Sequence, residues 1–244
     1  MAETPLVTLS VALCFALVHV LGKYLRFLQK TPRSIWLSLS GGVSLAYVFV
    51  HVLPELAQKQ EESLRHLSAD EGGALGLHVY LTALAGLVLF YGLDRMVRSA
   101  HGGRGKAGPG KPHPRAPVFW VHLGAYAIYS ALIGYLLVHR EEADTRGLII
   151  YGVALGLHFV VNDQGLRQDH GRAYDDKGRW ILAAAPLLGW AAGLAVAVSA
   201  VAVASIFAFL AGGILLNVLK EELPEDRESR YWRSGSAPSS SRCS

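Results

Sequence analysis

Three polar side chains stand in apolar stretches of this 244-residue chain and could bind a divalent cation. His158 and Asn162 are four residues apart, so a helix places them on one face. His122 stands in the preceding apolar stretch, and in an antiparallel pair of helices all three residues can share one depth. Neutral imidazole suits Zn²⁺, Fe²⁺ or Ni²⁺. The pattern predicts one cavity for the three residues, whereas a purely structural reading makes the histidines hydrogen-bonding groups between helices.

A second candidate site ends the apolar stretch GGVSLAYVFVHVLPEL, residues 41–56. His51 and Glu55 are four residues apart, and Pro54 between them is expected to stop the helix. One imidazole and one carboxylate could attract a cation at the mouth of a pathway. The same pair could equally be the polar end of a helix among lipid headgroups. Asp163, next to Asn162, is the nearest anion at the other end of such a pathway.

The elements that must position these residues are apolar segments. Hydrophobic residues make up 52% of the chain and charged residues 17%. The apolar segments are apolar all round rather than amphipathic, which predicts an all-α, polytopic membrane bundle within residues 1–225 and not a soluble domain. Seven spans are expected, each needing about 20 residues: 5–22, 35–55, 75–93, 118–138, 147–163, 180–198 and 202–220.

The distribution of Lys and Arg predicts the orientation, because cytoplasmic loops collect them. With seven spans and the N-terminus outside, 19 of these residues fall inside and four outside. Treating 180–219 as one span gives a weaker split of 14 to nine. The C-terminus is therefore predicted to be cytoplasmic, in a bacterial inner membrane or a plasma membrane. The first segment is not expected to be a cleaved signal peptide, because its basic residues follow the apolar run.

The polar segments are expected to be connections. Residues 98–117 are rich in Gly, Pro and basic residues, which indicates a flexible cytoplasmic loop. Residues 163–179 mix both charges and are expected to form a solvated loop. The tail, 226–244, has the low-complexity composition of a disordered segment.

Several classes of function find no support in the sequence. The two cysteines offer neither a disulfide framework nor a metal-binding pair. Hydrolase motifs are missing, so the chain is not expected to be an enzyme or to hold a cofactor. A pI near 9.1 reports membrane orientation here rather than nucleic-acid binding. A seven-helix retinal protein needs a lysine in the middle of the last span, and Lys220 lies at its edge.

The two segments that end in Pro-Glu are similar to each other. Residues 40–56 and 210–226 align without gaps and share six of 17 positions. The identities are Gly42/Gly212, Leu45/Leu215, Val48/Val218, Leu53/Leu223, Pro54/Pro224 and Glu55/Glu225. The two predicted spans run in opposite directions, as in the inverted repeats of secondary transporters. A chance match of two helix ends would give the same alignment.

These segments resemble spans of the ZIP (Zrt/Irt-like) family of metal transporters. Residues 42–55, ending in His-Val-Leu-Pro-Glu, are similar to the family's second span, and residues 211–225 to its seventh. The basic loop 98–117 falls where the family has a variable cytoplasmic loop. The resemblance implies two inverted three-helix repeats around spans four and five. It also implies transport of zinc, iron or manganese, with the lipid bilayer and divalent metal ions as partners and a homodimer as an open alternative.

The chain departs from the family at two points. ZIP proteins have eight spans, whereas this sequence turns polar after Leu219. The family's fourth and fifth spans carry His-Asn-x-x-Asp/Glu-Gly and His-Glu-x-Pro-His/Glu, but here the positions read His-Leu-Gly-Ala-Tyr-Ala from His122 and His-Phe-Val-Val-Asn from His158. Two imidazoles and an amide make a weak cage for a dehydrated divalent cation. Two hypotheses follow: a transporter with a degenerate metal site, or a transport-inactive scaffold or metal sensor.

Overall fold

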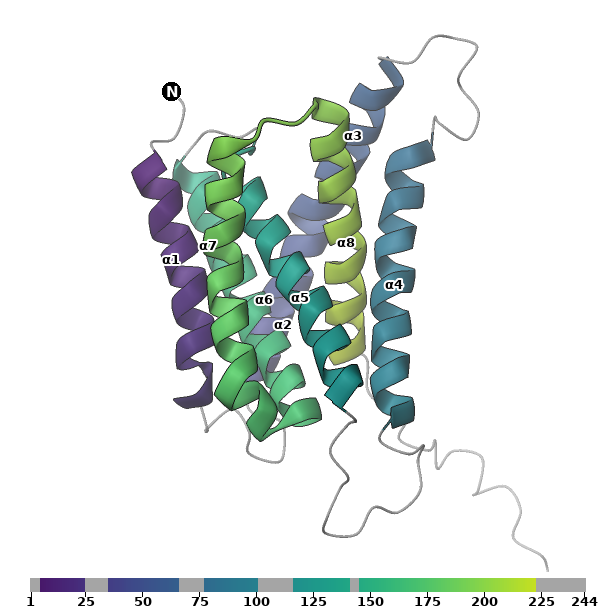
Figure 1. Cartoon of the computed structure of the whole chain (residues 1–244). Helices are drawn as coiled ribbons and strands as arrows, with labels where there is room; N and C mark the ends of the chain where they lie inside the picture. Colours follow the sequence, from purple (N-terminus) through teal and green to yellow (C-terminus); the bar gives the residue numbers. More distant parts are fainter. Residues whose placement is uncertain (1–4, 25–34, 66–76, 101–115, 141–144, 223–244) are drawn as a thin grey trace, which may run out of the picture.

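The computed structural model describes residues 5–24, 35–65, 77–100, 116–140 and 145–222, and every element in these ranges is a helix (Figure 1). The elements are α1 (Pro5–Leu21), the 3₁₀ turn η1 (Gly22–Tyr24), α2 (Ile35–Tyr47), the π-helical turn η3 (Val48–Val52), α3 (Leu53–Arg65), α4 (His78–Ala100), α5 (Ala116–Leu136), α6 (Thr145–His170), the π-helical turn η6 (Tyr174–Gly178), α7 (Arg179–Ala195) and α8 (Ala200–Glu222).

Among the residues that the structure describes, six helical segments are long and apolar enough to cross a membrane. They are residues 5–24, 39–62, 78–100, 116–136, 145–170 and 200–220. This arrangement agrees with the predicted fold class: the described elements are all helical, and the six apolar helices are compatible with a multi-pass membrane protein. Helix α7 has only 17 residues and contains Pro186, so it falls short of these six. The seventh crossing stays a prediction.

Residues 180–219 form two helices rather than one. Helix α7 ends where Val196 turns to an extended conformation, with φ of −129° and ψ of 112°. Helix α8 begins four residues later, where the Ser199 hydroxyl accepts a hydrogen bond from the Ala202 amide at 3.3 Å. A serine at this position satisfies one of the unpaired amides of a helix start. The chain reverses here, so α7 and α8 run antiparallel (Figure 1).

The expectation that Pro54 stops the second helix is wrong. The chain continues helically from α2 through η3 into α3, which reaches Arg65. Proline lacks an amide hydrogen and its ring collides with the preceding turn of an α-helix. The wider π-helical turn at Val48–Val52, directly before the proline, accommodates that collision. His51 and Glu55 therefore lie along one continuous helix rather than at its end.

The prediction that residues 163–179 form a solvated loop is also wrong for much of this segment. Helix α6 runs to His170, and it ends at Gly171, whose φ of 54° suits a residue without a side chain. Asp163 and His170 are 1% and 3% exposed. Of the other expected connections, residues 98–100 and 116–117 belong to α4 and α5. The remainder of the loop and the tail lie outside the described residues.

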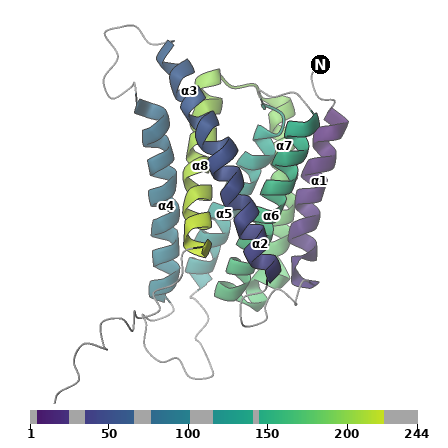
Figure 2. The same cartoon turned by 180° about the vertical axis from the view of Figure 1, so that it is seen from behind.

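Two helix pairs approach so closely that only glycine fits between them. Helix α4 packs along α8, and α5 packs along α7. A side chain added at Gly212 would overlap the Ala83 carbonyl, and one at Gly189 would overlap the Ala131 carbonyl. Small residues allow this backbone approach in membrane helices. Helix α1 packs on α6 and α7, and α2 packs on α6 (Figure 2).

Candidate functional site

His158 stands in a buried hydrogen-bonded group between α5 and α6. Its Nε2 atom is 2.9 Å from Tyr129 Oη and 3.0 Å from Asn162 Nδ2. An amide NH₂ group only donates, so His158 Nε2 accepts and the ring carries its proton on Nδ1. His158 is 2% exposed. The nitrogen that a metal would bind is therefore occupied by two protein donors.

His122 pairs with His170, near the end of the bundle where α6 ends. His122 Nδ1 and His170 Nε2 are 2.8 Å apart, so one ring donates its proton to the other. Phe119 and Tyr126 pack edge-on against the pair, with ring centroids 5.2 and 5.1 Å away. Two imidazole nitrogens on one tetrahedral zinc ion would be about 3.3 Å apart, given bonds of about 2 Å. To share such an ion, the two rings would have to separate and to turn so that a lone pair of each nitrogen faces the metal.

A cavity of about 20 Å³ adjoins this pair, and we call it the His122 cavity. Its lining comprises His122, Tyr126, Val161, Asn162, Gly165, Leu166, Asp169, Asn217 and Lys220. The volume holds about one water molecule. The Tyr126 hydroxyl donates to Asn217 Oδ1 at 3.2 Å, while the buried Asn217 Nδ2 lacks a hydrogen-bond partner among the described residues. Imidazole, amide, phenol and one carboxylate, that of Asp169, thus line a single cavity.

The cation of Lys220 beside this cavity is neutralised from α4. Lys220 Nζ donates to Asp94 Oδ1 at 2.5 Å, and Arg98 Nε lies 2.7 Å from Asp94 Oδ2. The Asp94 carboxylate therefore holds two cations at once. This arrangement keeps the ammonium directed at α4.

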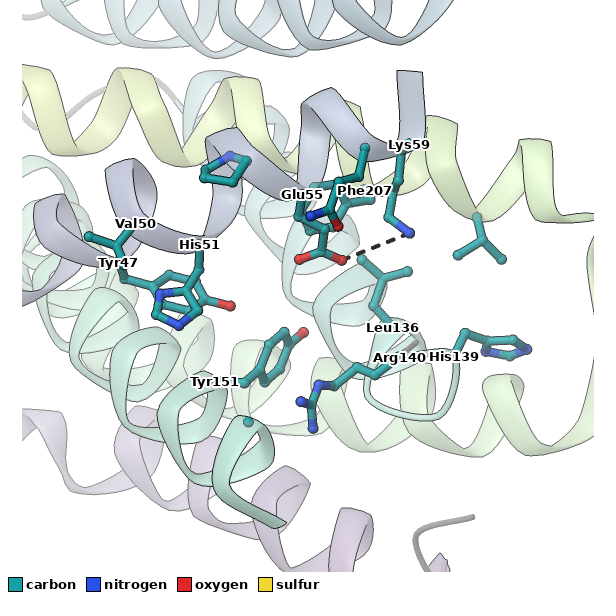
Figure 3. Close-up of a pocket in the computed structure, with 14 residues that line it drawn as sticks. Tyr47, Val50, His51, Glu55, Lys59, Leu136, His139, Arg140, Tyr151 and Phe207 are labelled. Atoms are coloured by element: carbon teal, nitrogen blue, oxygen red, sulfur yellow. Dashed lines mark ion pairs between the residues drawn. The ribbon is translucent and has the colours of Figure 1, made fainter. Parts of the chain in front are cut away.

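A second pocket lies towards the opposite end of the bundle, and we call it the His51 pocket (Figure 3). Its volume is about 190 Å³. Its lining comprises Tyr47, Val50, His51, Pro54, Glu55, Gln58, Lys59, Leu136, His139, Arg140, Gly147, Tyr151, Val203 and Phe207. Figure 3 shows the Glu55 carboxylate turned into the pocket, with Tyr151 and Arg140 across from it.

An apolar layer lies between the two polar regions. Its side chains enclose a void of about 20 Å³ and include Val52, Ile133, Leu136, Leu155, Leu210 and Ile214. Tyr151 belongs to this layer as well as to the His51 pocket, and its hydroxyl donates to the Ile133 carbonyl at 3.0 Å. The layer thus separates the His51 pocket from the His158 group and the His122 cavity.

Asp163 belongs to a different cluster, which ties α6 to α1. Its Oδ1 atom lies 2.7 Å from His19 Nδ1, and both side chains are 1% exposed. Arg167, one turn further on, donates to the Gly22 carbonyl at 3.1 Å and to Asp175 at 2.8 Å. Burial and the nearby Asp163 charge raise the pKa of Tyr174 well above its usual value, so its phenol stays protonated. The cluster fixes the end of α1 against α6.

The predicted residues therefore fall into three places. His122 and Asn162 line one cavity, and His158 adjoins it through its bond to Asn162. His51 and Glu55 line the separate His51 pocket, while Asp163 faces α1. Across the described parts of the chain, no three His, Cys, Asp or Glu side chains are grouped closely enough to hold a metal ion.

Comparison with known proteins adds no relative: no family model, no curated protein and no solved structure matches this chain.

Sequence reasoning missed most partners of the predicted residues. The missed residues are His19, Tyr126, Tyr129, Arg140, Asp169, His170 and Asn217. The sequence holds a signal for one of them, His170. It lies eight residues after Asn162, which itself lies four residues after His158, so the three recur at multiples of four on α6. That periodicity extends a helical face beyond the point where the apolar run stops. The tyrosines carry no comparable signal, since phenols are common in any membrane helix.

Proposed function

We propose that this chain is a ZIP-like membrane transporter of divalent metal cations, with the His122 cavity and the His158 group as its cargo-binding region. The observation that carries the proposal is the sequence of environments within one bundle. A polar pocket, an apolar layer and a second set of buried polar groups follow one another. A transporter needs such an arrangement, because a closed apolar layer prevents leakage between two accessible sites.

The donor set decides what cargo the region could take. Imidazole nitrogens favour zinc or iron over harder cations such as calcium. Asp169 supplies a carboxylate that the sequence pattern lacked, but the remaining donors are neutral. Neutral donors offset little of the cost of dehydration. We therefore expect the cation to keep part of its water shell and to bind weakly, as suits a cargo that must leave again.

Loading requires that internal hydrogen bonds open. His158 Nε2 must leave Tyr129 and Asn162, and His122 must separate from His170, before either nitrogen can bind a cation. The protein donors thus satisfy the site while no cargo is bound, which keeps buried polar atoms paired. The apolar layer must also part for a cation to arrive from the His51 pocket. Tyr151 and Leu136, on α6 and α5, face α8 residues there.

The packing of the helices supports an inverted repeat in this proposal. Helix α6 packs on α1 and α2, and α5 packs on α7 and α8. An axis that exchanges α5 with α6 would also exchange these two outer pairs. The same axis would also exchange α2 with α8, the helices that contain most of the aligned residues 40–56 and 210–226. In the proposed orientation the His51 pocket faces outside and the His122 cavity faces the cytoplasm.

A transport-inactive scaffold or metal sensor is the second candidate. It is favoured by one observation: within the described ranges, no three metal-binding side chains of the usual types form a group. Uptake into sealed proteoliposomes, measured ion by ion for zinc, iron and manganese, separates the two candidates. Uptake above that of protein-free vesicles supports the transporter. If none of the three ions enters over a range of pH, the scaffold or sensor becomes the better account.

A further inference from the structure

We propose that an anionic phospholipid binds where α1 ends and α7 begins, with its phosphate between Lys23 and Arg179. Helix α1 packs along α7, and the two helices run in opposite directions, so the end of one lies beside the start of the other (Figure 1). Neither residue lines the His51 pocket or the His122 cavity. The inference therefore does not depend on cation transport.

Four residues, which we call the Lys23 surface, form two cation–aromatic pairs: Lys23 with Tyr24, and Arg179 with Trp180. Lys23 Nζ lies 4.7 Å from the centre of the Tyr24 ring, and Arg179 Cζ lies 4.6 Å from the centre of the Trp180 ring. Both cations also act electrostatically on the Tyr24 hydroxyl, so the two pairs are neighbours. A ring face attracts a cation without neutralising its charge. Two positive charges thus lie close together at this surface.

Neighbouring carboxylates do not cancel this charge. Asp175, four residues before Arg179, is engaged by Arg167, whose Nε atom lies 2.8 Å from its Oδ1 atom. Asp176 is exposed, and within the described ranges neither it nor another carboxylate forms an ion pair with Lys23 or Arg179. Both cations are partly exposed. A guanidinium presents paired N–H donors that match the oxygens of a phosphate.

The exposed faces of α1 and α7 match the acyl chains of a lipid. Their exposed apolar residues include Leu13, Leu17 and Leu21 on α1 and Ile181 and Leu188 on α7. Tyr24 and Trp180, which are 66% and 52% exposed, stand at the ends of these apolar faces. Tyrosine and tryptophan are enriched at this depth, because an apolar ring and a polar group fit the boundary between hydrocarbon and headgroups. Apolar faces, aromatic rings and cations thus follow the order of acyl chains, glycerol and phosphate in a phospholipid.

Charge complementarity favours an anionic lipid over a zwitterionic one. Phosphatidylcholine carries its own ammonium beside the phosphate, whereas phosphatidylglycerol keeps a net negative charge. The distribution of Lys and Arg predicts that this end of the bundle faces the cytoplasm. Anionic lipids give that leaflet its negative surface potential, which attracts basic residues next to a membrane helix.

The test is titration of the full chain in detergent micelles with either lipid, followed by native mass spectrometry. The first phosphatidylglycerol should bind at least about fivefold more tightly than phosphatidylcholine, since one basic residue near an anionic lipid contributes about that factor. Lys23→Gln and Arg179→Gln should each weaken phosphatidylglycerol binding about fivefold and leave phosphatidylcholine binding unchanged. Arg95→Gln is the matched control. It removes an exposed cation from the same end of the bundle, on α4 at the far side from α1, and should leave both affinities unchanged (Figure 1).

Three results would overturn the proposal. The first is equal affinity for the two lipids, and the second is an equal loss in Arg95→Gln. The third is displacement of phosphatidylglycerol by an equal concentration of glycerol 3-phosphate, because the acyl chains would then add nothing and the ligand would be a soluble phosphate ester. Lys23 and Arg179 belong to different elements, so either variant decides the question if size exclusion shows that the other is misfolded.

Discussion

Replacing Gly212 by alanine should force α8 away from α4 and lower the free energy of unfolding. A Cβ atom at this position would overlap the Ala83 carbonyl and crowd the Leu87 amide nitrogen, both of which belong to the backbone of α4. Backbone atoms cannot rotate aside as a side chain can, so the helices must separate. Gly86 meets the Phe209 carbonyl from the other helix in the same way, so the closeness of α4 and α8 rests on glycine at both positions.

The magnitude follows from two opposing effects. Overpacking of a well-packed core costs about 1–3 kcal/mol, and a backbone clash belongs at the upper end. Alanine recovers about 1 kcal/mol, because it is the better helix former. The net loss for Gly212→Ala should therefore be about 2 kcal/mol. Gly92 on α4 is the matched control, since no atom lies within 4 Å of its added Cβ. Gly92→Ala should gain up to about 1 kcal/mol.

The assay is reversible unfolding in mixed micelles by titration with dodecyl sulfate, followed by circular dichroism. The two variants should differ by about 3 kcal/mol, which combines the loss in one and the gain in the other. Equal stabilities for Gly212→Ala and Gly92→Ala would refute the reasoning, because the helices would then not be held together at Gly212.

Three further predictions concern the buried polar groups and the topology. Tyr129→Phe removes the 2.9 Å hydrogen bond to His158 and should lower the free energy of unfolding by about 1 kcal/mol in the same titration. An unchanged free energy of unfolding would contradict this hydrogen bond. Asp163→Asn should cost about 2 kcal/mol, because it removes the charge opposite His19. The exposed Asp176→Asn is its control, and an equal effect of both would contradict the cluster. With native Cys14 and Cys243 replaced, an impermeant thiol reagent applied outside should label a cysteine at Ser63 and miss one at Gly105. The reverse pattern would invert the proposed orientation.

Much of the helical fold could be predicted from hydropathy alone. Apolar segments need backbone hydrogen bonds within themselves in a membrane, so a long apolar run is a helix almost by necessity. The division of residues 180–219 into two helices was predicted from charge counting. The structure realises it at Val196, where the backbone becomes extended.

Hydropathy could not predict where helices continue past the apolar runs. Helix α6 extends to His170 because Asp163 and Arg167 find buried partners on α1 and in η1, so polar residues remain helical without facing water. The prediction that the second helix ends at Pro54 was wrong in a similar way, because the chain stays helical through this residue. A π-helical turn before it lets the helix pass, and such turns have no simple sequence signature.

The candidate site was predicted in its leading residues but not in its partners. His122, His158 and Asn162 drew attention because polar groups within apolar helices are rare. Which groups they meet depends on how helices rotate and pack, which one sequence does not reveal. Asp169 shows the consequence, because it brings a carboxylate into a cavity that the motif comparison had left without one.

Zinc uptake into proteoliposomes by the parent chain, His158→Ala and His170→Ala tests the central claim most directly. The parent should accumulate zinc with saturation, His158→Ala should fall to the level of protein-free vesicles, and His170→Ala should take up zinc with weaker apparent affinity. His78→Ala, a histidine at the start of α4 outside the cavity, should behave like the parent. Parent-like uptake by a folded His158→Ala protein would show that the cation does not pass this group, and the proposed cargo-binding region would be wrong.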